Sequence, residues 1–195
     1  MNLPPIVALF IDTEGTFRPE RIEHMSIGLD LSADRVLQNI SVIHIQSVNE
    51  FELLIPKLEE LISTKQIKLV VIDSLTSIFR LELAKPDIAN SKTINQLMKL
   101  GKKFLEWTNQ FNVAIVCTSQ ITSAMSKTFF FDVIPVLATI LNQFFKQSVF
   151  LAENEEVTAS MENKGRRYAH LINGQKKKES IAQFIITEQG IRDFY

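Results

Sequence analysis

The stretch IVALFIDTEG, from Ile6 to Gly15, decides the fold that the sequence predicts, because an unbroken apolar run stops there at a polar, acidic group. Three later runs have the same character, being short and rich in β-branched residues: Ile40–Ile45, Leu69–Ile72 and Val113–Cys117. Runs that do not alternate between apolar and polar positions are typical of strands covered on both faces. We therefore predict a parallel sheet built from these four segments.

Amphipathic segments separate the apolar runs. Phe51–Thr64 and Ile94–Phe111 both place apolar residues at helical spacing, which predicts two helices. Asn49 is the expected N-cap of the first helix, and Pro56 is expected to limit or shift its start. The second helix carries three lysines that form either a solvated face or a phosphate contact: Lys99, Lys102 and Lys103.

The pattern changes after Gln120. Three short strand candidates, separated by turn signals, predict hairpins that extend the sheet: Ser148–Ala152, Arg167–Ile172 and Ala182–Thr187. The apolar segment Phe129–Leu151 contains charges and is expected to be a buried or partner-facing helix, since its uncharged run is too short for a bilayer. The predicted fold is α/β: a three-layer core with a mostly parallel sheet and C-terminal antiparallel hairpin strands, in one domain over residues 1–195.

Composition fits a globular domain outside the membrane. The chain has 195 residues, of which 46% are hydrophobic and 22% charged, and its net charge is −1. No overall basic field indicates a nucleic-acid partner, so any such site must be local. The single cysteine, Cys117, fits a reducing compartment, and the first residues lack the pattern of a signal peptide. We expect a cytoplasmic protein that does not insert into membranes.

Acids, hydroxyls and an amide follow three of the predicted strands, where open α/β sheets bind ligands. An acid directly after an apolar strand, as at Asp73, is the Walker B arrangement, whose carboxylate holds Mg²⁺ through water. Glu14 is a candidate general base for an attacking water, and Gln120 can donate to a terminal phosphate. The alternative is that all three side chains cap the helices that follow them.

Four segments in this order resemble the RecA-family recombinases of the RadA type. They are FIDTEGTFRPERI (Phe10–Ile22), LVVIDSLTSIFR (Leu69–Arg80), TSQI (Thr118–Ile121) and ITEQGIRD (Ile186–Asp193). The resemblance covers essentially the whole chain. It implies a RecA-like ATPase core that uses ATP and Mg²⁺, forms filaments on single-stranded DNA and catalyses homologous pairing and strand exchange in DNA repair.

The resemblance also implies roles for individual residues. Glu14 matches the catalytic glutamate, Asp73 the Walker B aspartate and Gln120 the glutamine that links the ATP state to a DNA-binding loop. Further nucleotide contacts are implied for Arg21, against the adenine, and for Ser74 and Asn173. Near the two DNA-contact loops, the candidate DNA-binding residues are Lys85, Lys92, Lys127, Phe129 and Phe130. Clustered phenylalanines are also common in cores and interfaces.

Two departures from the family pattern bear on activity. No G-x-x-x-x-G-K-[ST] loop occurs in the chain, and in the family that loop precedes the first strand seen here, as do a DNA-binding domain and a linker for polymerisation. The stretches that match the DNA-contact loops lack the family's glycines and most of its cations. We therefore expect weak or absent ATPase activity from this chain alone. The expected partners are other recombinase subunits, either copies of itself or full-length members. An alternative function is that of a catalytically silent paralog that binds and modulates a full-length recombinase filament.

Overall fold

The computed structural model describes residues 6–83, 89–123, 133–153, 165–173 and 176–193. The chain divides into two compact units. The first unit contains residues up to Phe17 together with Gln38–Phe144, and the second contains Arg18–Leu37 together with the residues from Phe145 onward. Each unit is described by itself below.

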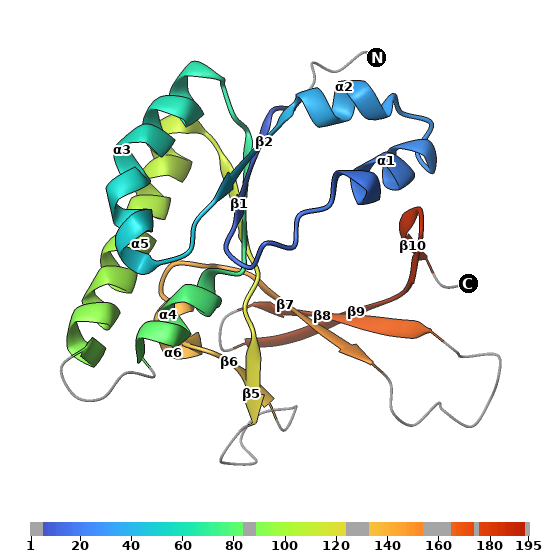
Figure 1. Cartoon of the computed structure of the whole chain (residues 1–195). Helices are drawn as coiled ribbons and strands as arrows, with labels where there is room; N and C mark the ends of the chain where they lie inside the picture. The colour runs from blue at the N-terminus through green and yellow to red at the C-terminus, as the bar shows by residue number, and fades with distance from the viewer. Residues whose placement is uncertain (1–5, 84–88, 124–132, 154–164, 174–175, 194–195) are drawn as a thin grey trace. The chain divides into compact units, whose positions relative to one another are not determined.

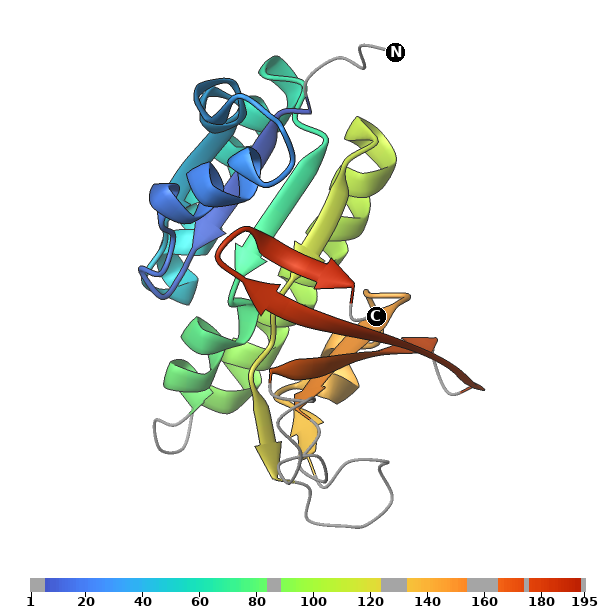
Figure 2. The ribbon, with the colours of Figure 1, turned by 90° about the vertical axis from the view of Figure 1, so that its right-hand side faces the viewer.

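A parallel sheet of four strands forms the centre of the first unit (Figure 1). Its strands are β1 (Ala8–Asp12), β2 (Ile40–His44), β3 (Leu69–Asp73) and β4 (Ala114–Cys117). They lie in the order β2-β1-β3-β4, and every neighbouring pair is parallel, so the predicted parallel sheet is confirmed (Figure 2). In this register Asp12 lies between His44 and Asp73, which brings the carboxyl ends of three strands together.

Two long helices, α3 (Val48–Thr64) and α5 (Ala89–Phe111), lie side by side along the sheet (Figure 1). The core between these layers consists of side chains that are almost fully buried, among them Leu9, Ile11, Phe51, Leu58, Ile72, Leu97, Phe104 and Trp107. Trp107 has no exposed surface and donates its indole N–H to Glu59 Oε1 on α3 at 2.8 Å. A shorter helix, α4 (Leu75–Leu83), follows β3 directly and contacts α5.

The start of α3 differs from the prediction. Its N-cap is Ser47, whose side chain accepts the N–H of Glu50 at 3.1 Å, while the Glu50 carboxylate accepts the N–H of Gln46 at 2.8 Å. Each of the two side chains thus accepts a backbone N–H group at the start of the helix, where such donors have no partner within the helix. The prediction of Asn49 as N-cap is therefore wrong, and Pro56 lies inside the helix at an exposed position without setting its start.

The apolar segment after β4 is not one helix. Its described part forms β6 (Val133–Pro135), which pairs antiparallel with β5 (Ile121–Ser123), then the short helix α6 (Ala138–Leu141) and, in the second unit, β7 (Ser148–Glu153). Pro135 has no backbone N–H to donate within a helix. Leu137 takes a left-handed backbone with φ 60° ahead of α6. These two positions interrupt the helix predicted from apolar content.

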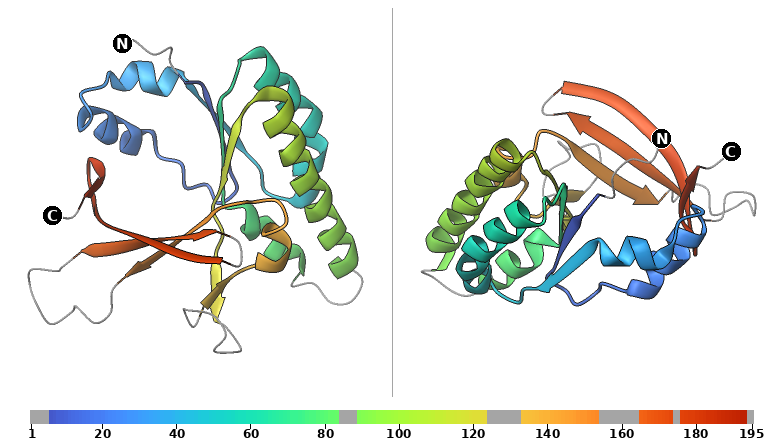
Figure 3. Two further views of the ribbon diagram at one scale, coloured as in Figure 1. Left: turned by 180° about the vertical axis from the view of Figure 1, so that it is seen from behind. Right: turned by 90° about the horizontal axis from the view of Figure 1, so that it is seen from above.

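The second unit is built on an antiparallel sheet of four strands in the order β10-β9-β8-β7 (Figure 3). Its remaining strands are β8 (Arg166–Asn173), β9 (Lys176–Thr187) and β10 (Gly190–Asp193). The predicted hairpins are confirmed, but their expected pairing with the parallel sheet is wrong. Each of these strands pairs antiparallel with its neighbours in sequence, and the four form a sheet separate from the parallel one.

Helices α1 (Pro19–Ile27) and α2 (Ala33–Gln38) precede these strands by more than a hundred residues. Two hydrogen bonds connect the α1 region to the C-terminal strands. The guanidinium of Arg21 donates to the carbonyl of Glu188 at 3.1 Å, and that of Arg192 donates to the carbonyl of Gly28 at 2.7 Å. Within the described residues, no helix combines the length and the apolar character needed to cross a bilayer.

Candidate nucleotide-hydrolysis site

Asp12, the last residue of β1, organises the turn that follows it. The side chain is only 4% exposed, and its two oxygens accept four backbone N–H groups. Oδ1 accepts from Glu14 at 3.1 Å, Gly15 at 2.8 Å and Thr16 at 3.2 Å, and Oδ2 accepts from Phe17 at 3.0 Å. Gly15 has φ 70°, a left-handed backbone that glycine adopts without steric cost. The turn is thus wrapped around the carboxylate.

The hydrogen bonds also decide the charge of Asp12. Burial raises the pKa of this carboxyl group, but the four backbone donors outweigh burial and hold the pKa below its ordinary value of 3.8. Asp12 is therefore ionised at neutral pH. Sequence reasoning did not single out Asp12, although an aspartate three residues before a glycine is a known turn signal.

A cluster of hydroxyl groups joins the ends of β1 and β3. Thr13 Oγ1 accepts the N–H of Ser74 at 2.9 Å and lies 2.8 Å from the Ser74 carbonyl oxygen and 2.7 Å from Ser77 Oγ. The N–H of Thr13 donates to the carbonyl of Asp73 at 2.9 Å. The peptide bond between Asp73 and Ser74 is cis. Thr13 and Ser77 are further residues that the sequence did not reveal, because their contact joins positions 64 residues apart.

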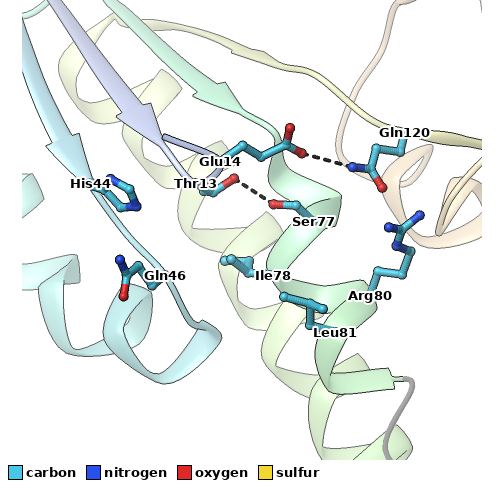
Figure 4. Close-up of a pocket in the computed structure, with 9 residues that line it drawn as sticks. All are labelled: Thr13, Glu14, His44, Gln46, Ser77, Ile78, Arg80, Leu81 and Gln120. Carbon is cyan, nitrogen blue, oxygen red and sulfur yellow. Dashed lines mark hydrogen bonds between the residues drawn. The ribbon is translucent and has the colours of Figure 1, made fainter. Parts of the chain in front are cut away.

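Glu14 is held by two donors from other strand ends. Its Oε1 accepts the Ser74 hydroxyl at 2.8 Å. The same oxygen accepts the Gln120 side-chain amide at 3.0 Å (Figure 4). The N–H of Gln120 in turn donates to Thr76 Oγ1 at 3.0 Å, which ties the residues after β4 to the first turn of α4. Gln120 Oε1 is buried and has no hydrogen-bond partner among the described residues. The structure thus brings together Glu14, Ser74 and Gln120.

Asp73 lies beside this group but does not line the same cavity. Its Oδ1 accepts the hydroxyl of Thr118 at 2.5 Å, and the residue is partly exposed at the end of β3. The part of the chain that the structure describes holds no cluster of three or more His, Cys, Asp or Glu side chains that could bind a metal directly. A single carboxylate at a strand end suits Mg²⁺ held through its water shell, as the Walker B arrangement requires.

The strand ends open onto a cavity of about 490 Å³ (Figure 4). Its wall combines carboxylate, amide, hydroxyl and cationic groups with two apolar side chains: Thr13, Glu14, His44, Gln46, Ser77, Ile78, Arg80, Leu81 and Gln120. A wall of this composition can hold water against Glu14 and offers both hydrogen-bond donors and acceptors to a polar ligand.

The other predicted site residues belong to other elements of the chain. Arg21 belongs to α1 and Asn173 to the end of β8, both in the second unit. Lys92 is exposed on α5 in the first unit. The remaining four DNA-contact candidates fall outside the described residues: Lys85, Lys127, Phe129 and Phe130.

Comparison with known proteins agrees with the motifs. The model of the Rad51 family matches residues 6–194. A curated relative, the DNA repair and recombination protein RadA of Aeropyrum pernix, is 35% identical to this chain over an alignment 195 positions long. The alignment covers 95% of this chain and 56% of the relative. The chain therefore spans about half the length of this relative. The resemblance indicated by the four motifs is confirmed.

Proposed function

Because the chain belongs to the Rad51 family, whose members bind single-stranded DNA and form oligomeric filaments, we propose that it carries part of an ATP-hydrolysing centre. This part comprises the groups that activate water and hold Mg²⁺. The centre would serve homologous pairing and strand exchange in DNA repair.

The observation that carries the proposal is the fixed carboxylate of Glu14. Two donors, from Ser74 and Gln120, hold Oε1 at the wall of the cavity, while Oε2 has no partner within the described residues. A carboxylate that is fixed through one oxygen can accept a proton from, or orient, a water molecule through the other. Glu14 is therefore the proposed general base of the hydrolysis.

Asp73 and Gln120 complete the proposed arrangement. Bound through water to Asp73, Mg²⁺ would neutralise charge on the phosphates of ATP. The side-chain N–H of Gln120 donates to Glu14, and its buried side-chain oxygen has no hydrogen-bond partner in the part of the chain that the structure describes. A carboxamide in this position can change its hydrogen bonds when either Glu14 or the chain that follows Gln120 moves. This supports a role for Gln120 in linking the nucleotide state to the chain beyond β5. Contacts of Arg21, Ser74 and Asn173 with the nucleotide remain part of the proposal.

The chain carries no G-x-x-x-x-G-K-[ST] loop, whose backbone amides and lysine supply most of the grip on phosphates. We therefore propose that the chain by itself hydrolyses ATP weakly or not at all. The same observation favours a second candidate function, in which the chain docks on a full-length recombinase filament and modulates it without catalysis.

A chimera tests the proposed catalytic role. A segment carrying a phosphate-binding loop, taken from a Rad51-family recombinase, is joined ahead of Ile6, and ATP turnover is measured with single-stranded DNA. The chimera should hydrolyse ATP, and Glu14→Gln should lower its rate by a factor of about 10²–10⁴, the range for loss of a general base. Glu23→Gln, at an exposed position of α1, is the matched control and should leave the rate unchanged.

Two outcomes would contradict the proposal. Turnover by the unmodified chain that falls on Glu14→Gln would show that the centre is already complete. A chimera that hydrolyses ATP equally well with Glu14→Gln would remove Glu14 from the chemistry. Co-sedimentation of the unmodified chain with filaments of a full-length recombinase, without any effect of Glu14→Gln, would favour the docking function.

A further inference from the structure

Asp12 is a buried acid that the proposed chemistry does not use. It does not line the cavity, yet its carboxylate is almost fully removed from solvent and accepts four backbone donors. A buried charge is costly unless every oxygen is well satisfied. The turn of residues 14–17 meets that requirement, which indicates that the turn and the carboxylate depend on each other.

We propose that Asp12 is a positioning residue for Glu14. Its carboxylate fixes the backbone of the turn 14–17 and thereby aims the Glu14 side chain at Ser74 and Gln120. The inference rests on the role of Glu14 proposed above.

The first step of the argument is the shape of the turn. Three consecutive N–H groups, of residues 14, 15 and 16, converge on Oδ1 of Asp12. Convergent N–H groups of this kind form a concavity that binds anions. Here the anion is the chain's own carboxylate, so the turn holds Asp12 in the position that a phosphate occupies in other loops. The backbone of Glu14 is thereby fixed from inside the chain.

The second step is the dependence of the Glu14 contacts on that backbone. Glu14 itself is exposed, and its side chain is held only by the two donors to Oε1 within the described residues. One donor is the Ser74 hydroxyl. The backbone of Ser74 is hydrogen-bonded to the side chain of Thr13, the residue after Asp12. Two hydrogen bonds to a flexible side chain persist only if the backbone that carries the side chain and the groups that donate to it are both held in position. Asp12 holds the backbone of Glu14 in that position.

Nuclear magnetic resonance of the 195-residue chain tests the inference without nucleotide. The probe is the side-chain amide of Gln120, which donates to Glu14, and Glu14→Ala gives the reference signals of a Gln120 without this partner. Asp12→Asn keeps the size of the side chain but removes its charge, and it should move the Gln120 signals toward the Glu14→Ala positions. Thr16→Ala removes only an exposed side chain and keeps the N–H that Asp12 accepts, so its signals should match the wild type.

A folded Asp12→Asn chain with wild-type Gln120 signals would overturn the inference. If Asp12→Asn does not fold, Gly15→Ala provides the answer, because alanine strains the same turn at φ 70° while its Cβ meets His44 at an ordinary 3.4 Å. Gly15→Ala should shift the Gln120 signals in the same direction, and unchanged signals would again overturn the inference. Since no step involves ATP, the result is independent of whether the proposed hydrolysis is found.

Discussion

Single side chains determine the chemistry at the strand ends. Asp12 fixes one turn, Thr13 joins two strands, and Glu14 receives donors from residues 60 and 106 positions away. Each contact is short, but the set depends on three strands ending at the same edge of one sheet. The residues therefore act as a group whose members are expected to couple energetically when they are mutated.

Asp12 should make the stability of the chain depend on pH in a defined direction. Its pKa in the folded state lies below the ordinary value of 3.8, so its stabilisation is complete above that value and is lost as the pH falls through the folded-state pKa. At neutral pH, Asp12→Asn should lower the free energy of unfolding by about 1–3 kcal/mol. Urea denaturation of both chains should show this difference shrinking in acid, and a difference that stays constant would contradict the assignment.

Part of the site could be predicted from the sequence and part could not. Asp73 follows an apolar run directly, and Glu14 and Gln120 come shortly after two others, so strand ends alone suggested that they would lie near one another. The structure supports this for Glu14 and Gln120, while Asp73 bonds instead to Thr118. Thr13 and Ser77 were missed because hydroxyl residues are common in turns, and only the register of β1 against β3 brings these two together.

At the scale of elements, strands were predicted better than helix ends. An apolar run between polar residues marks a buried strand almost by itself, whereas a helix start depends on which of several nearby residues caps it. Ser47 and Asn49 both fit an N-cap by residue type. In the structure Ser47 accepts the N–H of Glu50 and the Glu50 carboxylate accepts the N–H of Gln46, so a start at Ser47 satisfies two backbone donors. The apolar segment after β4 was misread because apolar content alone does not distinguish a helix from short strands.

The cap of α3 can be tested directly. Ser47→Ala leaves the N–H of Glu50 without its acceptor and should lower the free energy of unfolding by about 1 kcal/mol. Ser63→Ala, at an exposed position near the other end of the same helix, should change it by less than about 0.5 kcal/mol. Denaturant titrations compare the two variants, and equal effects would argue against Ser47 as the N-cap.

Gly101, inside α5, is expected to resist replacement for a reason of packing. A Cβ at this position would overlap the ring of Phe144, so Gly101→Ala should destabilise the chain by about 1–3 kcal/mol despite the better helix propensity of alanine. In a Phe144→Ala background the overlap is gone, and the same change should stabilise by up to about 1 kcal/mol. Urea denaturation of the wild type, the two single variants and the double variant measures both effects. An equal loss of unfolding free energy in both backgrounds would exclude the overlap as the cause.

For the whole molecule, charge limits how it can meet DNA. The net charge is −1, so any attraction to single-stranded DNA would have to come from a few local cations. Each contacted phosphate contributes a slope of about −0.7 to the logarithm of affinity against the logarithm of salt concentration. We expect a shallow slope that Lys92→Ala makes shallower by about 0.7, with Lys57→Ala on α3 as an exposed control. Fluorescence anisotropy measures the slope, and affinity that does not respond to salt would exclude direct phosphate contact.

The hydrogen bond from Arg21 to Glu188 joins positions 167 residues apart. A ribosome adds about 5–20 residues per second, so roughly 8–33 s pass between the synthesis of the donor and that of its acceptor. The hydrogen bond from Arg21 therefore cannot form until 167 further residues have been synthesised. A premature stop codon anywhere before Glu188 would leave Arg21 permanently without this bond.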